Sequence, residues 1–98
     1  PFHPDTLASK VAYSMQITEV YPNPFTTSAT VSILIPVASH LQITLADLNG
    51  KALQVIADEY MAAGNHELII HRASKSAGIY FLVLRANGQM LTKKLVIE

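Results

Sequence analysis

Short runs of alternating apolar and polar residues, separated by turn-forming residues, constrain the fold of this chain more than any other feature. A period of two predicts strands with one buried face, and no stretch predicts a convincing helix. Seven short strands with turn signals about every 10 residues are typical of a β-sandwich, so we expect an all-β fold. The expected strands are 16–20, 29–35, 40–46, 52–57, 66–71, 78–84 and 89–97.

Alternation also assigns residues to the two faces of these strands. In the strand 40–46, we expect Thr44 and Ala46 to face outward. The strand 78–84 is apolar on both faces, which predicts a central strand that is covered on both sides. The residues expected to share an apolar face within their strand are Val31, Ile33 and Ile35; Leu41, Ile43 and Leu45; Leu53, Val55 and Ala57; and Leu68 and Ile70.

The strongest turn signals are two Asn-Gly pairs, Asn49-Gly50 and Asn87-Gly88. Both central positions of a type I′ hairpin turn need a positive φ, which asparagine and glycine tolerate. We therefore expect two tight hairpins, each closed by a two-residue turn. A longer connection is expected over 58–65, where alternation is lost.

The composition is that of one small folded domain, because half of the 98 residues are apolar and only 14% are charged. Seven basic and seven acidic residues give a formal net charge of +0, which does not favour nucleic acid or an anionic membrane as a partner. No apolar run approaches the roughly 18 residues of a transmembrane helix. No signal peptide is visible, and the chain begins at Pro1, so we expect part of a longer polypeptide or a processed product.

The residues that usually carry chemistry are few and scattered. Cysteine is absent, which excludes a disulfide framework and a thiol nucleophile. His66 and His71 are five residues apart on one expected strand, so they point to opposite faces and cannot chelate one metal ion. Glu67 and Asp47 have no paired carboxylate at an interpretable spacing. We therefore expect no catalytic residue, no cofactor and no metal site.

The segment Tyr21-Pro22-Asn23-Pro24-Phe25 is expected to be stiff and extended. Each proline fixes φ and lacks a backbone N–H, and the residue before each proline is pushed toward an extended conformation. Such a segment makes neither a helix nor a good central strand. We interpret it as the junction between a linker, residues 1–15, and a β domain, residues 16–98.

Several short motifs occur in a fixed order along this domain. They are Tyr21-Pro22-Asn23-Pro24-Phe25, Asp47-Leu48-Asn49-Gly50-Lys51, Ala63-Gly64, Gly78-Ile79-Tyr80-Phe81 and Thr92-Lys93-Lys94-Leu95-Val96-Ile97. This succession resembles the C-terminal sorting domain of the type IX (Por) secretion system, type A. The resemblance implies an Ig-like β-sandwich of about seven antiparallel strands, in agreement with the alternation. One departure is Glu98, since many members of the family end in a basic residue.

The resemblance further implies a C-terminal secretion signal and not an enzyme. An upstream cargo protein would be exported through the periplasm and across the outer membrane by the type IX translocon. An outer-membrane shuttle protein would receive the exported domain. A sortase-like cysteine protease would then remove the domain while the cargo is attached to the cell surface. Candidate cut sites in the linker are Ala8-Ser9 and 12–14.

The family also implies which residues matter for sorting. We expect Lys93 and Lys94 to contact the secretion machinery, and the other motif residues mainly to shape the fold. The alternative function is a fibronectin-III-like or carbohydrate-binding accessory module of a secreted enzyme, with Tyr13, Phe25 and Tyr60 as its aromatic platform. An exposed strand edge would also permit a homodimer. The implied sorting-motif residues are Tyr21, Pro22, Asn23, Pro24, Phe25, Asp47, Asn49, Gly50, Lys51, Gly78, Tyr80, Lys93 and Lys94.

Overall fold

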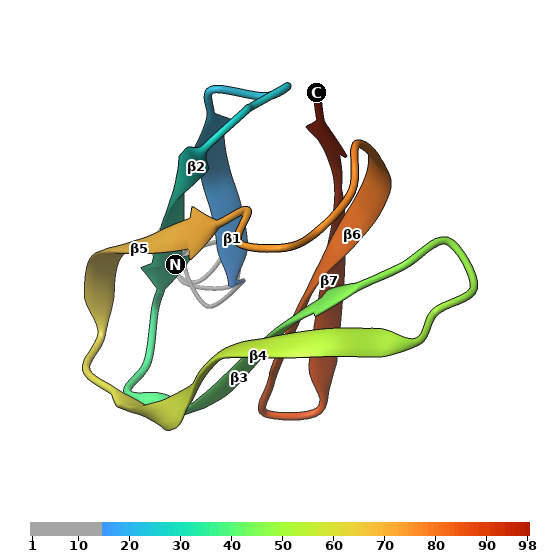
Figure 1. Ribbon diagram of the computed structural model, residues 1–98. Helices are drawn as coiled ribbons and strands as arrows, with labels where there is room; N and C mark the ends of the chain where they lie inside the picture. The colour runs from blue at the N-terminus through green and yellow to red at the C-terminus, as the bar shows by residue number, and fades with distance from the viewer. Residues whose placement is uncertain (1–14) are drawn as a thin grey trace, which may run out of the picture.

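The computed structural model describes residues 15–98, which form two antiparallel sheets packed face to face (Figure 1). The smaller sheet has the order β1-β2-β5, and the larger has the order β4-β3-β6-β7. The predicted all-β sandwich of seven antiparallel strands is thereby confirmed. The strands are β1 (Gln16–Tyr21), β2 (Ser28–Ile35), β3 (Ser39–Ala46), β4 (Ala52–Met61), β5 (Gly64–His71), β6 (Gly78–Ala86) and β7 (Gln89–Ile97).

The hydrophobic core lies between the two sheets and follows the predicted alternation in β2 and β5 and in most of β3. Each fully buried aliphatic side chain of this kind contributes about 1.5–3 kcal/mol relative to exposure. Met15, the last residue of the expected linker, also lies in this core. The fully buried aliphatic side chains are Val31, Ile33, Ile35, Leu41, Ile43, Leu45, Ile70, Leu82, Leu84, Leu95 and Ile97.

Strand β4 departs from the prediction in its faces and in its length. Its pairing with β3 shifts register twice, so Val55 lies opposite Thr44 while Ala57 lies opposite Ile43. A bulge inserts one residue and reverses the alternation beyond it, and therefore the expected common face of Leu53, Val55 and Ala57 is wrong. Leu53 and Val55 are 43% and 57% exposed. The strand also continues to Met61, which shortens the expected 58–65 connection to residues 62–63.

Strand β6 is central, as predicted, because it pairs with both β3 and β7. Its outer face, however, is not covered by any layer of the part of the chain that the structure describes. Ile79 is 40% exposed, and Phe81 and Val83 are half-buried. These two side chains flank Ala46 and Thr44 on β3, which face outward as expected but are nevertheless buried. The expectation of cover on both sides was wrong because apolar residues alone do not supply a third layer.

The two Asn-Gly turns differ from each other. Asn87 and Gly88 both have positive φ, +50° and +74°, and directly connect the paired residues of β6 and β7, which confirms a type I′ turn there. At the other pair only Gly50 has a positive φ, +83°, so the expected type I′ turn is wrong. The loop is longer: the Gly50 N–H donates to the Asp47 carbonyl, as in a type I turn followed by a left-handed residue.

Successive strands run in opposite directions, which places the chain's connections at two ends of the sandwich. The β1–β2 connection lies beside the end of β7 at the top of Figure 1, while the β6–β7 turn lies at the bottom. Because the number of strands is odd, the chain enters β1 at the opposite end from that at which it leaves β7.

Candidate functional site

The segment between β1 and β2 lies against the outer edge of β7. The Asn23 side chain makes two hydrogen bonds there: Oδ1 accepts from the Val96 N–H at 3.1 Å, and Nδ2 donates to the Lys94 carbonyl at 3.2 Å. A carboxamide offers a donor and an acceptor side by side, so it pairs with the strand edge much as a backbone would. The peptide bonds before Pro22 and Pro24 are both cis.

Phe25 completes this contact through its main chain. Its N–H donates to the Val96 carbonyl at 3.0 Å, and its carbonyl accepts from the Glu98 N–H at 2.9 Å. The phenyl ring is 1% exposed and belongs to the core. Pro22 and Pro24 have no N–H, so neither leaves a donor without a partner in this tight segment. The segment therefore covers the last part of the β7 edge, and that part is closed to a further strand.

Arg72 joins three parts of the chain at the same end of the sandwich. Its Nη1 donates to the main-chain carbonyls of Thr26 and Glu98, and its Nε donates to the Lys75 carbonyl at 3.0 Å. A guanidinium group presents several donors in one plane, which suits it to bridging separate carbonyls. Sequence reasoning missed Arg72, because a single arginine in a polar loop carries no periodic or motif signal.

The two lysines of the last motif, Lys93 and Lys94, point to opposite faces of β7. Lys93 pairs with Leu82 on the inner side but lies at the edge, beside Met15, Gln16 and Ile17, and is exposed. Lys94 pairs with Phe81 on the outer face and is also exposed. Partners across an antiparallel pair share a face, which fixes this assignment. The first and last motifs are thus brought together, with both lysine side chains left accessible.

The motif Asp47–Lys51 stays apart from residues 21–25 and from β7. The Asp47 Oδ1 atom accepts from the main-chain N–H groups of Asn49 and Lys51, each at 2.9 Å. These bonds explain why the loop is wider than a two-residue turn: the carboxylate organises the backbone around itself. Leu48, Asn49, Gly50 and Lys51 are exposed. The motif closes the β3–β4 hairpin and makes no hydrogen bond to residues 21–25 or to β7.

The remaining motif residues act inside the fold. Gly78 begins β6 with a φ of +154°, a conformation that a residue with a Cβ rarely adopts. Tyr80 is buried, and its hydroxyl donates to the Ser76 carbonyl at 2.6 Å. This is the arrangement of a tyrosine corner in Ig-like sandwiches, where the hydroxyl bonds back to the chain a few residues upstream. The expectation that Tyr80 buries its ring while its hydroxyl finds a partner is confirmed.

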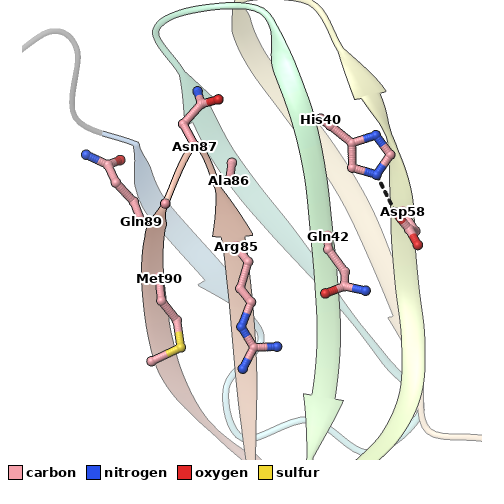
Figure 2. A pocket seen from close by; sticks show the side chains of 9 residues that line it. His40, Gln42, Asp58, Arg85, Ala86, Asn87, Gln89 and Met90 are labelled. Carbon is pink, nitrogen blue, oxygen red and sulfur yellow. Dashed lines mark hydrogen bonds and ion pairs between the residues drawn. The ribbon is translucent and has the colours of Figure 1, made fainter.

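A hollow on the outer face of the larger sheet was not expected from the sequence. It has a volume of about 480 Å³. Figure 2 shows His40 bonded to Asp58 on one side, with Arg85 and Met90 on the other. A second hollow of about 320 Å³ continues along the same face and shares Arg85 and Met90. Neither holds a nucleophile beside a base, and residues 15–98 contain no cluster of three or more metal-ligating side chains.

Two further expectations concern aromatic and linker residues. The aromatic platform of a carbohydrate-binding module fails at Phe25, which is buried, while Tyr60 is exposed and donates a hydrogen bond to the Ala38 carbonyl. Tyr13 and the candidate cut sites, Ala8-Ser9 and 12–14, lie outside the described residues.

Comparison with known families identifies the class of this domain. The family model of the secretion system C-terminal sorting domain matches residues 19–98. The chain therefore belongs to this family, and it carries a C-terminal sorting signal for type IX secretion, which implies export of an upstream cargo to the cell surface or beyond. No curated protein matches the chain. Within residues 15–98, no helix is long and apolar enough to cross a membrane.

Proposed function

We propose that this domain is a removable C-terminal sorting signal and not an enzyme. An outer-membrane shuttle protein of the type IX system recognises the folded sandwich after the translocon has passed it. A sortase-like cysteine protease then separates it from its cargo within the linker, residues 1–15. The cargo stays at the cell surface or is released, and the domain is discarded.

The observation that carries this proposal is the exposure of Lys93 and Lys94 on a strand that the rest of the domain holds firmly. Asn23 and Phe25 bond to the main chain of β7, so the fold fixes the strand without using either lysine side chain. The chain also enters β1 at the opposite end of the sandwich. An upstream cargo would therefore be tethered away from the end at which the first and last motifs meet.

The test is a fusion of residues 1–98 to a reporter protein, expressed in a host that has the type IX system. We expect the reporter at the cell surface, with a mass that lacks the domain. Replacing Lys93→Gln and Lys94→Gln together should lower surface reporter at least about tenfold, as expected when contacts worth roughly 1.4 kcal/mol or more are lost. The matched control is Lys93→Arg with Lys94→Arg, which keeps both charges and should be exported like the parent fusion.

Deleting 93–98 is a poorer experiment than these substitutions. The deletion removes Leu95 and Ile97 from the core and leaves Phe25 without its bonds to Val96 and Glu98, so folding and recognition fail together. Substituting the exposed lysines separates recognition from folding, because substitutions at exposed positions usually change the free energy of unfolding by no more than about 0.5 kcal/mol. Full export of the double glutamine variant would exclude direct recognition of these lysines.

A further inference from the structure

The outer face of the larger sheet is built from three rows of side chains that lie side by side across the strands. The middle row is uncharged and consists of Thr92, Val83, Thr44 and Val55. The row on one side contains Lys94 and Phe81, and the row on the other contains Met90 and Arg85. We call the surface formed by Val55, Phe81, Val83, Arg85, Met90 and Lys94 the outer β6–β7 face.

This face differs from the outer face of the smaller sheet. There, Tyr21 and Ile69 are 47% and 57% exposed on either side of Thr30, and in the next row the Ser32 hydroxyl bonds to the Glu67 carboxylate at 3.4 Å. On the outer β6–β7 face, Val55 and Met90 are exposed and Phe81 and Val83 half-buried, beside two neighbouring hollows that share Arg85 and Met90. Contiguous apolar surface with a polar rim is typical of a site where another protein binds.

The charges on this face are positive and have no partner within the described part of the chain. Neither the Arg85 guanidinium nor the Lys94 ammonium makes an ion pair or side-chain hydrogen bond with residues 15–98. By contrast, Asp58 already contacts His40, and Asp47 accepts two main-chain bonds. Lys94 and Arg85 stand two rows apart, on neighbouring strands, which corresponds to about 13 Å along the strand direction.

We propose that the outer β6–β7 face is the docking surface for the type IX outer-membrane shuttle protein, which meets it with an apolar side chain between two carboxylates. The apolar group seats over Val83. One carboxylate pairs with Arg85, whose fork of donors suits bidentate binding, and the other pairs with Lys94. This inference rests on the proposed function, and it extends recognition from the motif lysines to Arg85 and Met90, which lie outside the motifs.

The experiment compares substitutions that match in exposure but lie on opposite sheets. Met90 is 59% exposed on the outer β6–β7 face, and Ile69 is 57% exposed on the outer face of the smaller sheet. The probe is the purified shuttle protein of the host, titrated with the 98-residue chain, alongside export of the reporter fusion. Met90→Asp and Arg85→Glu should each weaken binding about tenfold or more, as for residues near the centre of an interface. Ile69→Asp should bind and be exported like the parent.

Val55→Asp, at the rim of the same face, should weaken binding by a smaller factor; circular dichroism melting checks that each variant is folded. Equal binding by Met90→Asp, Arg85→Glu and Ile69→Asp would overturn the inference. Export of the parent fusion without binding of the 98-residue chain to the shuttle protein would also overturn it. So would light scattering showing that Met90→Asp abolishes self-association of the chain while leaving its binding to the shuttle protein unchanged. A parent fusion that is not exported would instead refute the proposed function itself.

Discussion

The segments Tyr21–Phe25 and Asp47–Lys51 belong to the same expected set of sorting motifs, yet the fold uses them in opposite ways. The first places a phenyl ring in the core and bonds to a strand that follows it by about 70 positions. The second organises its own turn and leaves its side chains mostly in solvent. Residues that belong to one set of sorting motifs therefore include both a segment that holds the fold together and an exposed loop.

This difference gives each motif a separate signature in experiments. A structural segment should lose stability first and export only as a consequence. A substitution in an exposed turn can lower the stability of the domain only a little. A loss of export after such a substitution would therefore indicate a direct contact between the turn and a partner.

Phe25→Ala should cause the largest loss. Truncating a fully buried phenylalanine costs about 3–5 kcal/mol in free energy of unfolding, through lost burial and the cavity left behind. For a domain of this size that corresponds to a fall in Tm on the order of 15 °C or more. Thermal and urea unfolding measure it. Phe25→Leu keeps most of the apolar volume and should recover more than half of the loss; an unchanged Tm for Phe25→Ala would contradict the buried position.

Asn23→Ala should cost about 1–2 kcal/mol, because it removes two hydrogen bonds to the edge of β7, each worth roughly 0.5–1.5 kcal/mol. Asn23→Asp is the matched control. It keeps the oxygen that accepts from the Val96 N–H and loses the donor to the Lys94 carbonyl, so it should be intermediate. Hydrogen exchange at the Val96 amide gives a local measure: that amide should exchange faster in Asn23→Ala than in Asn23→Asp.

Asp47→Ala should have the smallest effect, about 0.5–1 kcal/mol, because its two bonds lie in an exposed turn. Asp47→Asn retains an oxygen in the same place and should be closer to the parent. Urea unfolding of the three chains provides the comparison. A loss as large as that of Phe25→Ala would mean that the turn is integrated with the core, which would abolish the contrast between the two motifs.

The sequence predicted much of the fold because alternation is a direct readout of burial. Strands β2 and β5 follow a strict period of two, and β6 does so on its inner face. Strand β4 could not be predicted, because its faces depend on where two bulges interrupt the pairing with β3. Propensity alone does not locate a bulge. The turn at 47–51 differs from the predicted type I′ turn because one carboxylate, that of Asp47, outweighs the preference of Asn-Gly for a tight turn.

The candidate site was harder to predict than the fold. The motif residues were recognisable in the sequence, but their grouping depends on contacts between segments far apart in the chain. The pairing of Asn23 with β7 and the bridging role of Arg72 leave no local pattern. The outer β6–β7 face was visible only as an apolar excess in the strand 78–84. That excess predicts burial on both faces, although the structure leaves the outer face partly exposed.

The bonds from Asn23 and Phe25 to Lys94, Val96 and Glu98 also determine when the domain can finish folding. They join segments separated by more than seventy residues, and a contact of that kind forms only after the intervening chain is available. A polypeptide that stops short of β7 lacks the main-chain partners of Asn23 and Phe25 and lacks the core residues Leu95 and Ile97. The contact of Asn23 and Phe25 with β7 thus makes folding depend on a complete chain. Only a chain synthesised through β7 can present the folded surface of the sandwich.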